Sequence, residues 1–237
     1  MSTFSIELKG FAASAWGQVL YPPHDPYLEV VSDNGEDLYL LHSTEFDGCT
    51  EAVQVLRIAV PLVRLLSAVM DMYFEGVEPL TIGAFIQERT DKGEIEMYSV
   101  AYMMHGRKRL PFIETDPDPY SPSVIQAALA KVSTVPPAVM DAIEHFSAMP
   151  VIDVGVGHTP KLDNWHDLYK AYEALGKVDG LVRYGIQRKE AERFSPQAQH
   201  FRHHKTTAPN TGMSLDEAKA LIISALRNAL STVTQAR

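Results

Sequence analysis

The residues of this chain best suited to chemistry are arginines and histidines gathered between residues 193 and 205, in the segment RFSPQAQHFRHHK. An imidazole titrates near neutral pH and can move the proton of a ribose 2′-hydroxyl, whereas a guanidinium can neutralise the charge that develops on phosphate oxygens. Arg193 and His200 lie seven positions apart, so they would share one face of a continuous helix. These two side chains are the candidate catalytic pair, and the chemistry that they predict is metal-free cleavage of RNA.

The residues around this pair carry a net positive charge, opposite in sign to that of the whole chain. Between residues 183 and 205 six Lys and Arg stand against two Asp and Glu, whereas the whole chain carries a formal net charge of −9. A local excess of positive charge predicts a contact for an anion, either a phosphate group or an RNA backbone. The candidate phosphate contacts are Arg188, Arg202, His203, His204 and Lys205.

Two other interpretations of the same segment stay open. The arginines can belong to a solvated polar loop between two helices, where they form salt bridges with the acidic remainder of the chain. Alternatively, His200, His203 or His204 can hold a metal ion, which would need a nearby carboxylate such as Glu190. Our prediction is that the chain has no metal site and no cofactor.

Apolar and polar residues alternate along several segments of the first half of the chain, as they do in partly buried strands. The predicted strands span 4–8, 27–31, 38–42, 80–88 and 94–103, the first of them being an edge or initial strand. Two hairpins are indicated by Asn34-Gly35, within a connection over 32–37, and by the turn at 91–93. Between the hairpins, apolar residues recur every three or four positions from 50 to 74, which predicts a helix kinked or divided at Pro61.

Helical periodicity dominates the second half of the chain. Helices are predicted over 124–132, 138–149, 164–175, 188–194 and 214–230, with Asn164 as the N-cap of the third. Ser195-Pro196 is expected to end the fourth helix, which weakens the convergence of Arg193 and His200. Residues 214–217 (Ser-Leu-Asp-Glu) form a capping box, the clearest local signal of a helix start in this sequence.

A change in composition separates the two halves. Four prolines and two aspartates lie between residues 111 and 122, a pattern typical of a linker. We therefore predict a domain of sheet plus helix over 1–112, a linker over 113–122 and a helical domain over 123–237. The fold class is α+β, with an N-terminal antiparallel β-meander packed on a long kinked helix and an α-helical C-terminal domain.

The segment from Asn164 to Arg237 resembles the HEPN families of bacterial RNases and of toxin or defence proteins. Those domains are helical and carry an arginine, four to six intervening residues and a histidine near the end of one helix, which another long helix follows. In this chain six residues separate Arg193 from His200, and the helix that begins at Ser214 comes next. The resemblance implies an RNA-binding protein or endoribonuclease that acts as a symmetric homodimer, in stress or antiphage defence.

The sequence also departs from the family pattern. Phe194 stands where a polar residue is common, and Pro196 falls inside the motif. A second alignment would use Arg202 with His203 or His204, which lacks the family spacing. The resemblance therefore leaves open which histidine acts.

The composition excludes several classes of protein. A hydrophobic content of 46% excludes disorder of the whole chain, and a single cysteine, Cys49, excludes an internal disulfide. The apolar stretch over 58–74 is interrupted by Pro61, Arg64 and Asp71, so we predict no membrane span. The start of the sequence lacks the features of an export signal, and we expect a cytoplasmic protein.

The expected partner is RNA or another anionic molecule, with a homodimer formed through the helical domain and no contact with a membrane. The competing class is a non-enzymatic interaction protein. In that case the basic Arg and His loop contacts an acidic partner, and the sheet binds a ligand or a protein.

Overall fold

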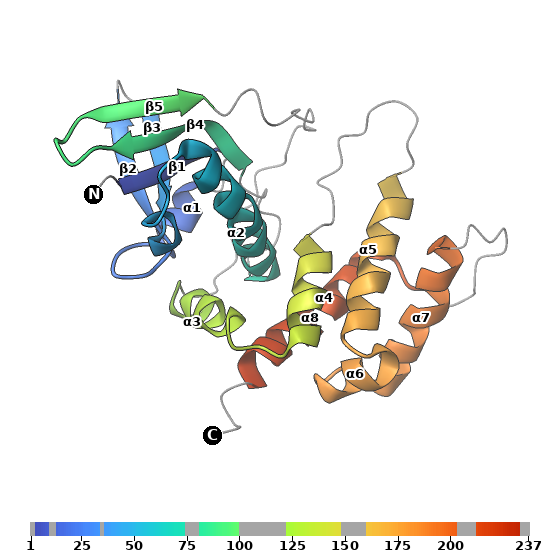
Figure 1. Cartoon of the computed structure of the whole chain (residues 1–237). Helices are drawn as coiled ribbons and strands as arrows, with labels where there is room; N and C mark the ends of the chain where they lie inside the picture. Colours follow the sequence, from blue (N-terminus) through green and yellow to red (C-terminus); the bar gives the residue numbers. More distant parts are fainter. Residues whose placement is uncertain are drawn as a thin grey trace. The chain divides into compact units, whose positions relative to one another are not determined.

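The computed structural model describes residues 3–9, 13–33, 36–73, 81–99, 122–147, 160–202 and 212–232. Five strands precede a series of helices, which confirms the predicted α+β class (Figure 1). The chain divides into two compact units whose main boundary falls between Gln126 and Ala127. Apart from Pro122, the predicted linker 113–122 lies outside the described residues, so the proposed three-part division stays a prediction.

A five-stranded antiparallel sheet forms the first unit, in the order β2-β3-β1-β4-β5 (Figure 1). The strands are β1 (Thr3–Lys9), β2 (Tyr27–Asp33), β3 (Glu36–His42), β4 (Thr81–Arg89) and β5 (Ile95–Ser99). Of the two alternatives predicted for β1, it is the initial strand of the chain but not an edge strand. With β1 between β3 and β4, the order is not that of a simple meander. In keeping with this interior position, all five residues from Phe4 to Leu8 are buried, including the polar Ser5 and Glu7, so both faces of the strand are covered.

The strands β2 and β3 extend closer to the turn that joins them than the sequence predicted. Its register pairs Tyr27 with His42 at the open end and Asp33 with Glu36 at the turn. Residues 34–35, which lie outside the described part, are all that separates the two strands. This register places the side chains of Tyr27 and His42 directly opposite each other, a pairing used below.

One face of the sheet is covered by the long helix α2 (Ala52–Tyr73), which packs against β1 and β4 (Figure 1). The sequence predicted that this helix would be kinked or divided at Pro61. The helix is continuous over 22 residues, so Pro61 does not divide it. Gln54, Arg57, Pro61 and Arg64 are exposed and form one stripe. Pro61 therefore frees the carbonyl of Arg57 on the solvent side, where water can satisfy it.

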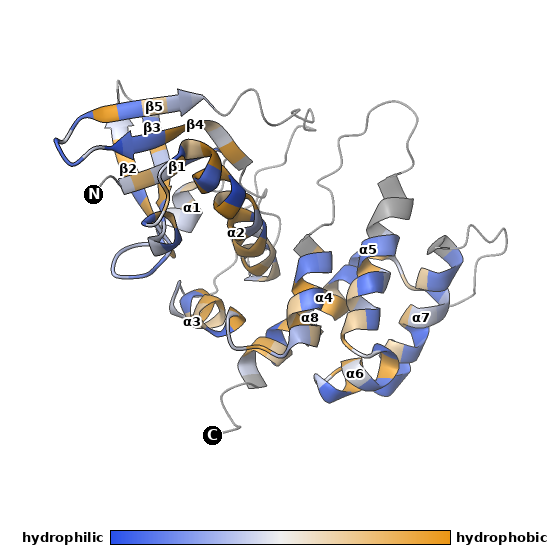
Figure 2. Cartoon of the chain, viewed as in Figure 1, coloured by the Kyte–Doolittle hydropathy of each residue, from blue (hydrophilic) through white to orange (hydrophobic). Residues whose placement is uncertain are grey.

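The other side of α2 is apolar, as Figure 2 shows by its hydrophobic residues. Among the helices described, α2 alone is long and apolar enough to cross a membrane, and 44% of its most apolar stretch is buried within the fold. A core helix of a soluble protein meets the same criterion, because both bury an apolar surface. The structure is compatible with a soluble protein.

Smaller elements complete the first unit. The helix α1 (Ala13–Gly17) packs against β2, and a short 3-10 helix, η1 (Thr44–Phe46), follows β3. The side-chain amide of Gln126, in the helix α3 (Pro122–Val132), donates to the carbonyl of Val19 at 2.7 Å.

The second unit is helical. Its helices are α4 (Pro137–Ser147), α5 (Pro160–Ala174), α6 (Lys177–Arg183), α7 (Arg188–Arg202) and α8 (Leu215–Thr232). The helix α5 packs against all four others and begins at Pro160, so the predicted N-cap Asn164 lies inside the helix. The core of the second unit contains Phe194, whose ring centroid lies 4.8 Å from that of Tyr172 and 6.1 Å from that of Trp165.

Candidate functional site

The helix α7 carries the candidate catalytic pair. The prediction that Ser195-Pro196 ends this helix was wrong, because α7 is continuous from Arg188 to Arg202 with Pro196 inside it. Pro196 is exposed, and so is Glu192, whose carbonyl loses its helical donor to the proline ring. Glu192 and Pro196 thus lie on the exposed side of the helix, while the buried Phe194 and Ala198 lie on the side that packs into the core.

Continuity of α7 puts Arg193 and His200 on the same face, two turns apart. Both side chains are half-buried, at the border between the buried and exposed sides of the helix. The Nδ1 atom of His200 is buried. Exchange of a proton with a ligand by this imidazole must therefore use Nε2.

Arg193 acts on the start of the next helix. The backbone N–H of Ser214 donates to Glu217 Oε2 at 2.7 Å, and the backbone N–H of Glu217 donates to Ser214 Oγ at 3.1 Å, which confirms the predicted capping box. The hydrogen bond from the Ser214 N–H lowers the pKa of Glu217, and the positive charge of Arg193 lowers it further. The α7 arginine and the α8 cap thus belong to one electrostatic cluster.

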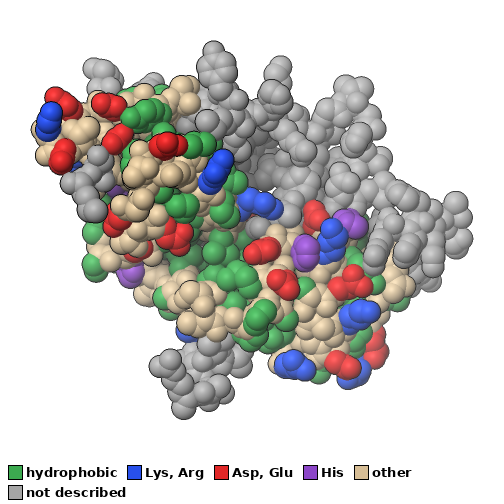
Figure 3. All heavy atoms as spheres, in the orientation of Figure 1, with side chains coloured by type: hydrophobic (Ala, Val, Ile, Leu, Met, Phe, Trp, Pro, Cys, Tyr) green, Lys and Arg blue, Asp and Glu red, His purple; other side chains and the backbone are tan. Residues whose placement is uncertain are grey.

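The predicted phosphate contacts have different positions. Arg188 is exposed but already paired, with Nη2 2.8 Å from Asp179 Oδ1 and Nη1 3.8 Å from Glu192 Oε1. Arg202 is the last residue of α7, and His203, His204 and Lys205 lie outside the described residues. On the face of the second unit seen in Figure 3, basic and acidic side chains are interspersed and form no continuous basic patch within the part described.

Metal and thiol chemistry find no support among the described residues. No group of three or more His, Cys, Asp or Glu is placed there so that it could hold a metal ion. Burial raises the pKa of the Cys49 thiol, which disfavours the thiolate that a cysteine nucleophile needs.

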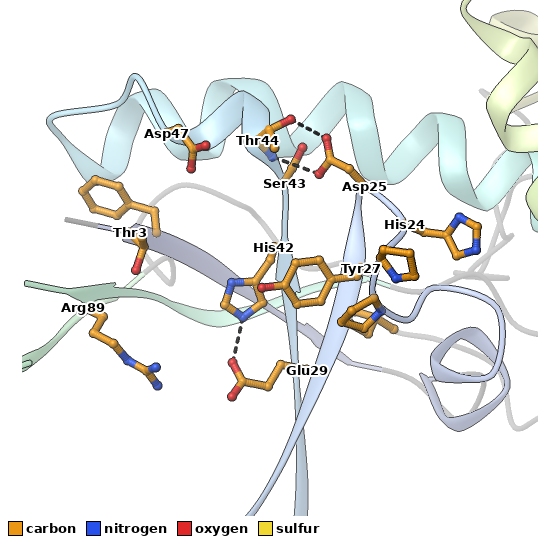
Figure 4. A pocket seen from close by; sticks show the side chains of 14 residues that line it. Thr3, His24, Asp25, Tyr27, Glu29, His42, Ser43, Thr44, Asp47 and Arg89 are labelled. Carbon is orange, nitrogen blue, oxygen red and sulfur yellow. Dashed lines mark hydrogen bonds and ion pairs between the residues drawn. The ribbon is translucent and has the colours of Figure 1, made fainter. Parts of the chain in front are cut away.

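The first unit contains a pocket of about 720 Å³ at the open end of the β2–β3 hairpin (Figure 4). Polar and charged side chains of β1, β2, β3, β4 and the adjoining loops converge on it. The polar and ionisable lining residues are Thr3, His24, Asp25, Tyr27, Glu29, His42, Ser43, Thr44, Asp47 and Arg89, and the apolar ones include Phe4, Leu28, Pro22 and Pro23. None of these residues was singled out as a site from the sequence.

An imidazole is held rigidly in the wall of this pocket. His42 Nε2 lies 2.9 Å from Glu29 Oε2, and the ring stacks on Tyr27 with centroids 4.8 Å apart and planes 6° from parallel. A carboxylate can only accept a hydrogen bond, so Nε2 carries the proton of the neutral ring. The lone pair then lies on Nδ1, the ring nitrogen that Figure 4 shows turned away from Glu29.

The charges around His42 oppose one another. Burial lowers the pKa of His42 below its ordinary value of 6.5; Glu29 acts in the opposite direction, and the positive charge of Arg89 adds to the lowering. The imidazole is therefore neutral at pH 7 and can accept a hydrogen bond. Such an arrangement of a carboxylate that orients a histidine is used for general base catalysis and for ligand recognition.

The remaining polar groups shape the rim. Both Oδ atoms of Asp25 accept hydrogen bonds from Thr44, one from the backbone N–H at 2.9 Å and one from the hydroxyl. Ser43 Oγ accepts a hydrogen bond from the N–H of Glu45 at 3.3 Å and caps η1. These bonds fix the loop beside His42.

Comparison of this chain with models of protein families, with curated proteins and with solved structures finds no match.

Proposed function

We propose that the helical unit is a HEPN-like module that binds RNA and cleaves it without a metal ion, with Arg193 and His200 as the reacting pair. The observation that carries this proposal is the continuity of α7 through Pro196, which keeps both residues on one face of one helix. Their half-buried positions add support, because packing restricts the side chains and leaves part of each accessible.

In the proposed reaction His200 takes the proton of a ribose 2′-hydroxyl through Nε2. The freed oxygen attacks the adjacent phosphorus and displaces the 5′-oxygen of the next nucleotide, which leaves a 2′,3′-cyclic phosphate. Arg193 stabilises the additional negative charge on the phosphate oxygens during this step. The proton reaches the departing oxygen from the imidazolium or from water.

The proposal extends to the surroundings of the pair. Arg202, His203, His204 and Lys205 would hold the RNA backbone beyond the end of α7, and Arg188 would do so only after release from Asp179. A homodimer formed by the helical units would bring two pairs together. We place the protein in the cytoplasm, with a role in stress or antiphage defence.

The test is cleavage of single-stranded and structured RNA by the purified full chain in EDTA. His200→Ala and Arg193→Ala should each lower the rate about 100-fold or more, the usual cost of losing a general base or a charge-stabilising group. The matched controls are His145→Ala, a half-buried histidine of α4, and Arg183→Ala, an exposed arginine of α6. Equal cleavage by all variants would attribute the activity to a contaminant and refute the proposal.

A His203→Ala, His204→Ala double variant tests the alternative alignment. Loss of cleavage in this variant alone would move the site from His200 to the segment that follows α7. End-group analysis should find cyclic phosphate. Ends of another kind would exclude the 2′-hydroxyl mechanism whichever histidine is involved.

A second candidate function is that of a non-enzymatic interaction protein. The ion pairs of Arg188 with Asp179 and Glu192 favour it, because they show a basic residue of α7 used within the fold. In this case Arg188→Ala should lower the stability of the helical unit and leave RNA affinity unchanged. A weaker affinity with unchanged stability would return Arg188 to the RNA contacts.

A further inference from the structure

The pocket at the end of the β2–β3 hairpin lies within the first unit, whereas the residues to which we assign RNA chemistry belong to the second. We propose that it binds a small, hydroxyl-rich monocarboxylate. The ligand's carboxylate accepts hydrogen bonds from the guanidinium of Arg89, and one of its hydroxyl groups donates to Nδ1 of His42.

The dimensions of the pocket suit such a molecule. A volume of about 720 Å³ falls within the range of sites that bind small ligands in proteins. The lining mixes apolar surfaces from Phe4, Leu28 and two prolines with hydroxyl and carboxylate groups. That mixture matches a ring or short chain that carries several hydroxyl groups.

Arg89 supplies the positive charge. It ends β4, opposite Thr3 of β1, and its side chain is exposed. Figure 4 shows the side chain of Arg89 at the lower left of the view, with Glu29 and His42 beside it near the centre. None of the ion pairs found among the described residues involves Arg89. Its guanidinium has a planar set of donors that matches the geometry of a ligand carboxylate.

His42 supplies the acceptor. The hydrogen bond from Nε2 to Glu29 fixes the tautomer, and the stack on Tyr27 fixes the ring plane. The neutral ring thus presents its Nδ1 lone pair in a defined direction. A ligand hydroxyl is a donor that can use it.

The acidic lining limits the charge of the ligand. Among the described lining residues, Asp25, Glu29 and Asp47 stand against one Lys or Arg, which is Arg89. A phosphate dianion would therefore meet more repulsion than attraction, whereas one carboxylate can be neutralised by Arg89. The remaining carboxylate oxygens can accept hydrogen bonds from hydroxyl groups.

A matched series of four sugars tests this inference on the full-length protein: glucuronate, glucose, glucosamine and glucose 6-phosphate. They share one ring and differ in charge. Binding is followed by the amide chemical shifts of the ¹⁵N-labelled chain. We expect glucuronate to shift the signals of β2, β3 and the loop at 43–47, with about tenfold higher affinity than glucose, the gain typical of a charge-assisted hydrogen bond.

Variants of Arg89 separate this site from nonspecific binding. Arg89→Gln should abolish the preference for glucuronate over glucose, and Arg89→Lys should retain part of it. Arg64→Gln, on the exposed face of α2, is the control and should retain all of it. The amide spectrum of each free variant establishes that the sheet is still folded.

Three results would overturn the inference. The first is that none of the four sugars, at a concentration of tens of millimolar, changes the amide chemical shifts of the pocket residues. The second is tighter binding of glucosamine or glucose 6-phosphate than of glucuronate. The third is a preference for glucuronate that survives Arg89→Gln in a folded protein.

Discussion

His42 and Tyr27 lie face to face across the β2–β3 hairpin, with ring centroids 4.8 Å apart and ring planes 6° from parallel. The stack follows from the register, because these residues are direct cross-strand partners. One edge of the imidazole contacts Glu29, and the nitrogen on the other edge, Nδ1, is turned away from Glu29. The hairpin is thus both a part of the sheet and the support of an ionisable group.

The first prediction concerns the titration of His42. Its pKa lies below 6.5, chiefly because burial disfavours the charged ring. Arg89→Gln should raise this pKa by removing a positive charge, and Glu29→Gln should lower it further by removing a negative one. The ring signals of His42, followed by NMR as the pH is changed, check both directions. Arg64→Gln should leave the titration unchanged, and shifts of the same sign in the Arg89 and Glu29 variants would contradict the assignment of charges.

The same pKa makes a contribution to stability with a defined sign. Between the lowered pKa and 6.5 the unfolded chain binds a proton at His42 that the folded chain does not. The contribution of His42 to the free energy of unfolding is therefore fully present above pH 6.5 and is lost as the pH falls toward the pKa of the folded state. The free energy of unfolding of a His42→Gln variant should depend less on pH in this window. An equally steep dependence in the variant would assign the effect to other groups.

The second prediction concerns the start of α8. Ser214→Ala removes the hydroxyl that accepts a hydrogen bond from the Glu217 N–H, and should cost about 1 kcal/mol in the free energy of unfolding. The pKa of Glu217 is lowered, so its contribution is present above the ordinary value of 4.5 and is lost as the pH falls through the folded value. Glu217→Gln should flatten that part of the stability profile, as measured by denaturation between pH 3 and 6. A variant that unfolds with the wild-type dependence on pH would exclude this role.

Part of the pocket could be predicted from the sequence. If Asn34-Gly35 alone forms the turn, the register follows, and Tyr27 must face His42. We placed a longer connection over 32–37, because only the apolar runs over 27–31 and 38–42 were predicted as strands. That choice left the register undefined and hid the pair.

Other parts of the structure depend on contacts that no local pattern encodes. Arg89 reaches the pocket because β1 is inserted between β3 and β4, a pairing between segments about 80 residues apart. The capping box at Ser214 was predicted because its two hydrogen bonds are local. Pro196 misled the prediction of α7, since only the packed structure shows that it faces solvent.

The third prediction concerns Gly180 in α6. A Cβ atom at this position would overlap the backbone carbonyl of Leu175, which a side-chain rotation cannot relieve. Gly180→Ala should therefore lower stability by about 1–3 kcal/mol, despite the higher helix propensity of alanine. Thermal unfolding followed by circular dichroism measures the effect. Gly48→Ala is the control, because no heavy atom lies within 4 Å of the Cβ that it adds, and an equal loss in both variants would exclude the steric explanation.

The fourth prediction separates the two possible roles of Pro196. In α7 this proline leaves the carbonyl of Glu192 without its helical donor, and both residues are exposed. Pro196→Ala supplies the missing N–H and a better helix former, so it should raise the free energy of unfolding by about 1–3 kcal/mol. Because the helix already continues through Pro196, Arg193 and His200 should stay on one face, and the proposed RNA binding should be unchanged. Lower stability would mean that the proline ring has packing contacts that alanine loses. Higher stability with loss of RNA binding would mean instead that the local geometry at Pro196 orients the two side chains, which makes the proline a positioning residue of the site.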